Sequence, residues 1–122
     1  NSKGDIIKLL DDKKLKSSFE IYLSLINKNQ IKAWKKNNIN KTEIIVLTGK
    51  VKFVFYDELN NIFKKSIISH DSNNKIIILK GIWYGFQNIF TSQSKLLSLT
   101  YPRFTENNIQ RKKIEEFNYN WG

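Results

Sequence analysis

Hydrophobic and polar residues alternate along much of the chain with a period of two, which is the pattern of half-buried β-strands. Residues 51–56 show it most plainly, because Val51, Phe53 and Phe55 share one face while Lys52 lies on the other. Similar runs recur, separated by segments rich in Gly, Asn, Asp and Ser. The predicted strands are 19–26, 31–34, 44–48, 51–56, 63–68, 75–79, 82–89 and 96–101. We therefore expect an all-β sandwich or barrel.

The residues between these strands predict how the strands connect. Thr48-Gly49-Lys50 predicts a tight hairpin between the strands on either side, and turn residues at 57–61 and 70–74 predict two further turns. Gly85 predicts a break within its strand. Residues 5–15 have a partly helical apolar face, which predicts a short N-terminal helix or an extension. We divide the chain into an N-terminal extension, 1–18, and one β domain, 19–122.

The composition is that of one globular domain rather than a disordered or membrane-spanning chain. Of its 122 residues, 40% are hydrophobic and 13% aromatic, which is enough to form a core. No apolar run approaches the length of a transmembrane helix, and residues 1–12 lack the architecture of a signal peptide. The absence of cysteine excludes disulfides and thiolate chemistry and agrees with a reducing compartment. We expect a cytoplasmic protein without membrane contact.

The formal net charge of +10 raises the question of a polyanionic partner. Only two of the 21 basic residues are arginine, and the lysines are spread along the chain rather than gathered in one stripe. Proteins that read bases or hold phosphates bidentately favour arginine. The abundance of Lys, Asn and Ile is also typical of an AT-rich genome. The sequence therefore disfavours nucleic-acid binding but is compatible with attraction of a small diphosphate ligand.

Few residues offer familiar catalytic or metal chemistry. His70 is the only histidine and lies in a predicted turn before Asp71, where solvent exposure is the ordinary expectation. One histidine without cysteine does not supply the ligand set of a typical metal site, so we expect no metal and no other cofactor. The sequence also lacks a Ser-His-Asp set, a P-loop and a dinucleotide-binding glycine pattern.

Four segments, in order, resemble motifs of the dTDP-4-dehydrorhamnose 3,5-epimerase family. Residues 31–37 (I-K-A-W-K-K-N) resemble the strand I-K/R-G-x-H, and residues 43–57 resemble the hairpin V-x-x-G-x-V-x-F-V-x-x-D. Residues 79–86 resemble I-P-P-G-x-x-H-G-F, and residues 117–121 resemble the closing I-x-Y-D/N-W. The match covers residues 19–121. The resemblance implies a cupin-like jelly-roll β-barrel that forms a homodimer and holds a nucleotide sugar in its interior.

The family's chemistry uses a His base, a Lys near the enolate oxygen and a Tyr acid. In this sequence Lys35 stands at the position of the base, Asn37 at that of a variant's later His, and Tyr84 at the His of the H-G-F motif. Thr42 stands where the family has its enolate Lys, and Tyr101 lies close to the expected late Tyr. The family's acid and base residues are therefore replaced.

Two hypotheses follow from the resemblance and these replacements. The first is an epimerase- or isomerase-like enzyme of nucleotide-sugar metabolism, serving surface polysaccharide synthesis by proton abstraction next to a ketone. Its catalytic residues would be Lys35 and Tyr84, and its substrate-binding residues Lys32, Asn37 and Tyr101. The alternative is a catalytically inactive cupin that binds a sugar nucleotide. A basic β-barrel that binds nucleic acid is a third and more distant hypothesis.

Lys35 and Tyr84 each have a purely structural interpretation as well. Lys35 is either a desolvated base near other lysines or part of an exposed, lysine-rich edge. Tyr84 is either a site residue, because a buried hydroxyl requires a partner, or part of the aromatic core. Strict alternation places Lys32 with Trp34 on one face, and Lys35 with Ala33 and Asn37 on the other.

Overall fold

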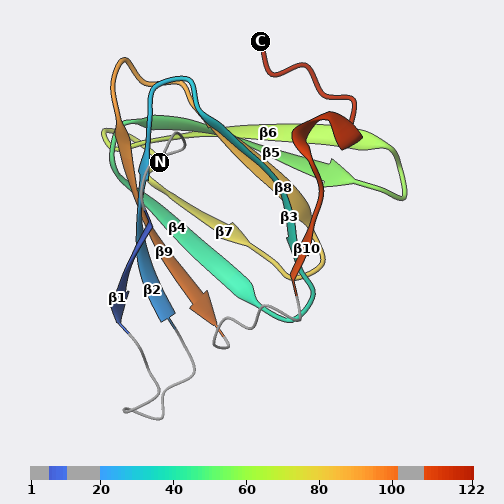
Figure 1. Cartoon of the computed structure of the whole chain (residues 1–122), viewed down its shortest axis with the longest axis horizontal. Helices are drawn as coiled ribbons and strands as arrows, with labels where there is room; N and C mark the ends of the chain where they lie inside the picture. The colour runs from blue at the N-terminus through green and yellow to red at the C-terminus, as the bar shows by residue number, and fades with distance from the viewer. Residues whose placement is uncertain (1–5, 11–19, 102–108) are drawn as a thin grey trace.

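The computed structural model describes residues 6–10, 20–101 and 109–122. Two five-stranded antiparallel sheets face each other and form a jelly-roll β-sandwich, as the sequence predicted (Figure 1). Sheet A has the order β1 (Ile6–Leu10), β2 (Glu20–Ile26), β9 (Ser94–Tyr101), β4 (Lys41–Thr48), β7 (Lys75–Ile78). Sheet B has the order β10 (Ile109–Arg111), β3 (Ile31–Asn37), β8 (Trp83–Asn88), β5 (Lys50–Asp57), β6 (Ile62–Ser69). A short 3₁₀ helix, η2 (Ile114–Glu116), follows β10.

The interior between the sheets holds the main hydrophobic core. The predicted alternation of β5 is confirmed there, because Val51 and Phe53 are fully buried in this core and Phe55 packs against it. Large apolar side chains from both sheets interdigitate and exclude water, which is the main source of stability in a domain of this size. The buried core residues are Ile26, Ile44, Val46, Val51, Phe53, Ile68, Ile78, Tyr84 and Leu96.

The outer face of sheet B is covered by the C-terminal segment of the chain, which lies across it in Figure 1. Trp34, Val54 and Trp83 point outward from this sheet and form a second buried cluster with Trp121. The indole Nε1 of Trp34 donates a hydrogen bond to the carbonyl oxygen of Ile114 at 3.1 Å. The strands at the centre of sheet B are therefore buried on both faces, which explains why Lys52, Val54 and Tyr56 do not form a simple polar face.

The predicted hairpin at Gly49 is wrong. β4 pairs with β7 and β9 in sheet A, whereas β5 pairs with β6 and β8 in sheet B, so the chain crosses between sheets at Gly49. Gly49 has a φ of +110°, and a Cβ there would lie 2.0 Å from the Oγ of Ser94. A glycine in the left-handed region serves either kind of turn, so its presence alone does not distinguish a hairpin from a crossover.

Other predicted connections have mixed outcomes. The turn at 57–61 does form a hairpin, because Asp57 pairs with Ile62. Gly85 does not break its strand, since β8 continues through it opposite Ala33. A Cβ on Gly85 would lie 2.4 Å from the Cβ of Ala33, so the glycine permits a close approach of two backbones.

The N-terminal helix predicted for residues 5–15 is not present in the described part of that segment. Residues 6–10 form β1, which pairs antiparallel with β2 at the edge of sheet A. A short isolated helix is unstable in water, whereas an edge strand gains backbone hydrogen bonds from its neighbour. The predicted domain boundary between residues 18 and 19 lies outside the described residues and stays a prediction.

Candidate ligand site inside the barrel

An irregularity in β3 decides where its lysines lie. Lys32 pairs with Phe86 and Lys35 pairs with Tyr84, while Trp34 is an extra residue between them in the ladder. Residues that are directly opposite in a ladder share a face of the sheet, and Tyr84 belongs to the interior core. Lys32 and Lys35 therefore both lie on the interior face. The prediction that Lys32 and Lys35 lie on opposite faces is wrong, because a bulge adds one residue to the count.

The neighbour of Lys35 points the other way. The ammonium of Lys36 lies 5.1 Å from the centre of the Trp83 ring on the outer face of sheet B. The same ammonium is 3.6 Å from a carboxylate oxygen of Glu58. Lys35 itself is half-buried, so the interpretation of residues 32–36 as one exposed lysine-rich edge does not describe its position. These two adjacent lysines occupy different environments.

Tyr84 lies opposite Lys35 and is 5% exposed. Burial raises the pKa of Tyr84 to about 12, although the nearby positive charge of Arg111 acts to lower it. Arg111 pairs with Lys35 from the other side, on β10. Because its pKa is raised, the phenol of Tyr84 stays protonated at neutral pH and is able to donate a hydrogen bond to a ligand oxygen.

Asn37 joins the two sheets at the same end of the barrel. Its Nδ2 donates to the Oγ1 of Thr42 at 3.3 Å, and that oxygen lies 3.4 Å from the Oγ1 of Thr100. Asn37 is 4% exposed, and its Oδ1 has no hydrogen-bond partner among the described residues. A buried amide oxygen without a partner carries a desolvation cost that a ligand donor or a water molecule would remove.

Sequence reasoning missed several polar residues that line this end of the interior. Glu20 is 2% exposed and pairs with Thr100, and the hydroxyl of Tyr22 donates to its carboxylate. Glu20 and Tyr22 share a face of their strand with the core residue Ile26. The alternation of the strand predicted at 19–26 could therefore have shown that these two polar side chains point into the interior. Arg111 gave no such signal, because its short strand shows no clear alternation.

The comparisons with known proteins agree with this architecture. No family model matches the sequence, and no curated protein matches it either. The structure is similar to CapF, a capsular polysaccharide assembling protein from Staphylococcus aureus, with a TM-score of 0.83 at 11% identity. It is also similar to a dTDP sugar isomerase from Desulfovibrio desulfuricans G20, with a TM-score of 0.78 at 17% identity. The Schizosaccharomyces pombe Cnp3 cupin domain gives a TM-score of 0.66 at 15% identity. The fold is that of a cupin.

The extent of these matches differs. The chain spans a third of the CapF chain (33%) but 88% of the isomerase chain and 59% of the Cnp3 structure. The matched share of this chain is 93%, 97% and 80%, respectively. At such low identities the likeness establishes the fold, and site chemistry rests on this chain's own residues. Among the described residues no helix is long and apolar enough to cross a membrane.

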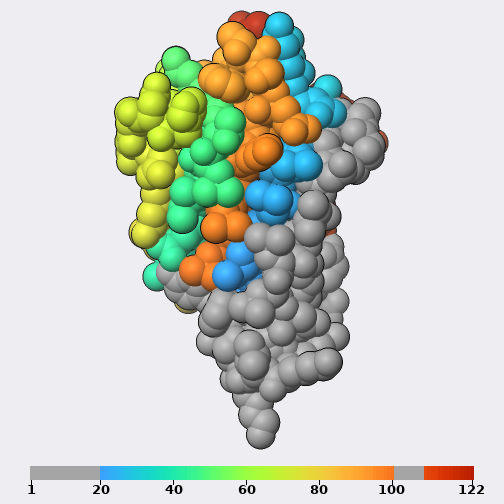
Figure 2. Space-filling view, turned by 90° about the vertical axis from the view of Figure 1, so that its left-hand side faces the viewer, coloured from blue at the N-terminus to red at the C-terminus, as the bar shows by residue number. Residues whose placement is uncertain are grey.

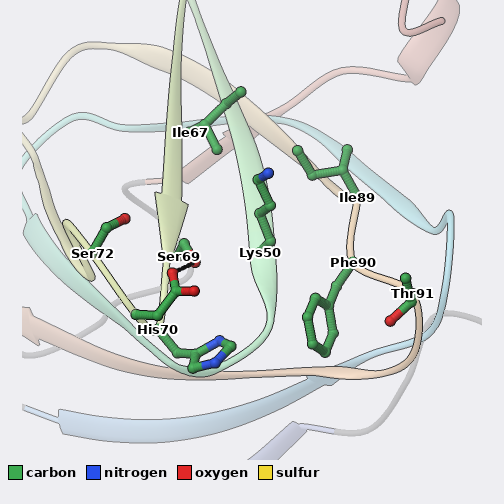
Figure 3. A pocket seen from close by; sticks show the side chains of 9 residues that line it. Lys50, Ile67, Ser69, His70, Ser72, Ile89, Phe90 and Thr91 are labelled. Atoms are coloured by element: carbon green, nitrogen blue, oxygen red, sulfur yellow. Dashed lines mark hydrogen bonds between the residues drawn. The ribbon is translucent and has the colours of Figure 1, made fainter.

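Two further residues named from the sequence are Tyr101 and His70. Tyr101 is the last residue of β9 and pairs with Lys41, and its side chain lies outside the described atoms, so its role stays a prediction. His70 lies at the opposite end of the barrel in a depression of about 430 Å³, where it faces Phe90 (Figure 3). It is exposed, as expected, and its Nδ1 lies 3.0 Å from the backbone nitrogen of Gly49. In the described part of the chain no three His, Cys, Asp or Glu side chains gather as a metal site would require.

The burial of Tyr84 predicts a specific loss of stability in alkali. Its folded pKa of about 12 lies above the value near 10 of an unfolded chain, so its contribution is complete below pH 10 and lost as pH rises to 12. The difference corresponds to about 3 kcal/mol of unfolding free energy. The free energy of unfolding is measured by urea denaturation between about pH 10 and 12. We expect the decrease caused by ionisation of Tyr84 in the wild type and not in Tyr84→Phe. An ultraviolet titration in which all five tyrosines ionise together near pH 10 would contradict the prediction.

Proposed function

We propose that this cupin binds a nucleotide sugar inside the barrel and acts on its keto-sugar as an epimerase or isomerase. The observation that supports this proposal most directly is the register of β3 and β8, which sets Lys35 opposite Tyr84 on the interior face. A half-buried amine beside a buried, protonated phenol is a pair suited to moving protons. The dTDP sugar isomerase and the capsular polysaccharide assembling protein CapF share the fold, and we propose this chemistry and this biological setting by analogy with them.

The proposed reaction begins with Lys35 as a neutral amine. It takes a proton from the carbon next to the keto group, and the electron pair of that C–H bond moves onto the carbonyl oxygen to form an enolate. The like charges of Lys32 and Arg111 on the same face favour the neutral form of an amine placed beside them. Tyr84 donates a hydrogen bond to the enolate oxygen, and reprotonation of the carbon on its other face completes the change of configuration.

Further residues of the interior, together with the exposed Arg111 on the edge strand β10, are proposed to hold the substrate. Lys32 and Arg111 present positive charge to a diphosphate, and the free Oδ1 of Asn37 is an acceptor for a sugar hydroxyl. We also propose Tyr101, a candidate from the sequence, as a substrate-binding residue. Sheet A presents the Tyr22–Glu20 hydrogen-bonded pair to the interior from the facing side, where a proton for the other face of the sugar would be needed. We place this activity in the cytoplasm, in surface polysaccharide synthesis.

The alternative function is a cupin that binds the sugar nucleotide without turnover. It is supported by the absence of a histidine in the interior among the described residues, since the single histidine lies at the other end of the barrel. In that case the polar side chains and the positive charge at the site would bind the sugar nucleotide but would not catalyse proton transfer.

Incubation with dTDP-4-keto-6-deoxyglucose in deuterated water separates the two functions. We expect deuterium at C3 or C5 of the sugar, measured by mass spectrometry, because the exchanged proton is drawn from solvent. Binding of the sugar nucleotide, measured by calorimetry, without deuterium incorporation would favour the inactive cupin. If the protein neither binds the sugar nucleotide nor incorporates deuterium, both proposed functions are overturned. Heat-denatured protein is the control for spontaneous exchange at these acidic C–H positions.

A further inference from the structure

The end of the barrel opposite the candidate ligand site carries a depression that the proposed function does not use. It has a volume of about 430 Å³ and lies among three connecting segments, at residues 48–50, 70–74 and 89–93. Figure 2 looks onto the side of the molecule that carries these segments, which are coloured green, yellow-green and orange. A depression of this size is large enough for a small ligand.

Hydrogen bonds within the chain fix the walls of this depression relative to one another. The backbone N–H of Ile89 donates to the carbonyl oxygen of Lys50 at 3.0 Å. The fully buried Asn88 holds the segment that follows it, because its Oδ1 accepts from the backbone N–H of Phe90 at 3.0 Å. Its Nδ2 donates to the carbonyl oxygen of Ser92 at 2.9 Å. A site whose backbone is already fixed loses little conformational entropy when a ligand binds.

The ring of His70 presents a hydrogen-bond donor to this depression. Its Nδ1 lies 3.0 Å from both the backbone nitrogen and the backbone oxygen of Gly49. That oxygen already accepts from the backbone N–H of His70 at 3.1 Å, whereas the N–H of Gly49 is a fixed donor. Nδ1 is therefore the acceptor, and the hydrogen of the neutral ring is on Nε2. Among the described residues Nε2 has no partner, so its N–H is available to a ligand.

Two opposite charges accompany this donor. The hydroxyl of Ser69 donates to Oδ1 of Asp71 at 2.5 Å. This bond, followed by the positive charges of His70 and Lys50, holds the pKa of Asp71 below its ordinary value. The group is therefore a carboxylate at neutral pH, and its other oxygen is still able to accept. No carboxylate of the described residues forms an ion pair with the ammonium of Lys50. The depression thus offers donors and an acceptor without a net charge.

Phe90 gives the depression an aromatic wall. Its ring is half-buried and meets the ring of His70 at 81°, with 5.8 Å between their centres, so the two rings are not stacked. Ile67 and Ile89 add aliphatic surface on the side of Lys50, as Figure 3 shows. A partly exposed aromatic ring in such a place is able to pack against a flat apolar face of a ligand.

We propose that this depression binds a neutral sugar ring. A hydroxyl group both donates and accepts, so neighbouring hydroxyls match the carboxylate of Asp71 and the N–H groups of His70 and Lys50. The C–H face of the same ring is apolar and would pack against Phe90. The proposal concerns the end of the barrel that lies away from Lys35 and Tyr84, and it does not depend on the proposed catalysis.

The same residues disfavour charged ligands. A phosphate would face the carboxylate of Asp71, and an organic cation would face the ammonium of Lys50. A zwitterionic amino acid matches both charges, but these two side chains are exposed, and ion pairs at exposed side chains contribute little. Hydrogen bonds to several hydroxyls together with ring packing are therefore the mode of binding that the depression supports best.

A titration of the ¹⁵N-labelled protein, followed by NMR, tests this site. The probes are the methyl glycosides of glucose, galactose, mannose and N-acetylglucosamine. We expect saturable shifts of the amides of residues 50, 69–72 and 89–91, at about millimolar concentrations because a small ligand in an open site makes few contacts. Asp71→Ala should weaken binding about tenfold, through loss of a hydrogen bond to a charged group. Phe90→Leu keeps an apolar side chain and should weaken it about threefold to tenfold.

Asp57→Ala is the matched control. Asp57 is likewise an exposed carboxylate that accepts hydrogen bonds within a turn, but it lies on the β5–β6 turn and does not line this depression. Its removal should leave the affinity unchanged. Circular dichroism first establishes that each variant folds. If Asp71→Ala fails to fold, Lys50→Met replaces it, because it also removes a proposed contact to the sugar while keeping the aliphatic part of the side chain.

Three results would overturn the proposal. The first is the absence of saturable shifts at these amides with all four glycosides up to about 100 mM. The second is an affinity that is the same in the wild type and in the folded variants. The third is saturation by inorganic phosphate or by glycine but by no glycoside, which would assign the depression to an anion or to an amino acid. Binding in the interior is reported by the amides of Lys35 and Tyr84, so this proposal and the proposed enzymatic function fail separately.

Discussion

Replacing Lys35 by methionine is expected to slow deuterium incorporation into the keto-sugar by about 10²- to 10⁴-fold, the usual contribution of a positioned base. Methionine keeps an unbranched apolar side chain, so it removes the amine while preserving most of the packing beside Tyr84. Incorporation at C3 and C5 is measured by mass spectrometry under single-turnover conditions. Affinity for the sugar nucleotide, measured by calorimetry, should change much less than the rate.

Lys36→Met is the matched control for this experiment. The two lysines are adjacent in sequence, but the Lys36 ammonium lies over Trp83 on the outer face of the sheet. Its removal deletes the same charge from the same strand without touching the interior. Equal loss of activity in both variants would indicate a general charge effect, and full activity of Lys35→Met would remove Lys35 from the mechanism.

Replacing Trp34 by alanine is expected to lower the free energy of unfolding by about 3–5 kcal/mol. Trp34 is 1% exposed, and its ring centre lies 5.3 Å from those of both Phe117 and Trp121. Its backbone exchanges two hydrogen bonds with Lys112. The substitution therefore removes a large buried ring and loosens the C-terminal segment that covers sheet B. Urea denaturation followed by far-ultraviolet circular dichroism measures the effect.

Leu59→Ala is the control for this stability measurement. Leu59 is 96% exposed, so its truncation removes little buried surface and should change the unfolding free energy by less than about 0.5 kcal/mol. A loss below about 1 kcal/mol for Trp34→Ala would mean that the outer cluster contributes little to stability. A loss confined to the C-terminal residues, seen as faster amide exchange there alone, would mean that the segment is a separate unit.

Local patterns in the sequence predicted most of the strands but only part of the site. The inward face of β5 was evident because Val51, Phe53 and Phe55 alternate regularly with more polar neighbours. The candidate positions Lys35 and Tyr84 came from motif resemblance, and their being opposite in register is a property of the pairing between β3 and β8. Arg111 was missed because its three-residue strand is defined only by its pairing with β3.

The sequence by itself determined the β class, the positions of most strands (all but β1 and β10) and which residues are apolar enough to form the core. A period of two is a local property, since it arises from the geometry of one extended strand. The tertiary structure alone decided that Gly49 is a crossover between sheets, and that residues 6–10 extend sheet A. It also decided that the extra residue Trp34 turns Lys32 and Lys35 to one interior face. These features depend on which strands pair, and that is set by contacts between residues far apart in the chain.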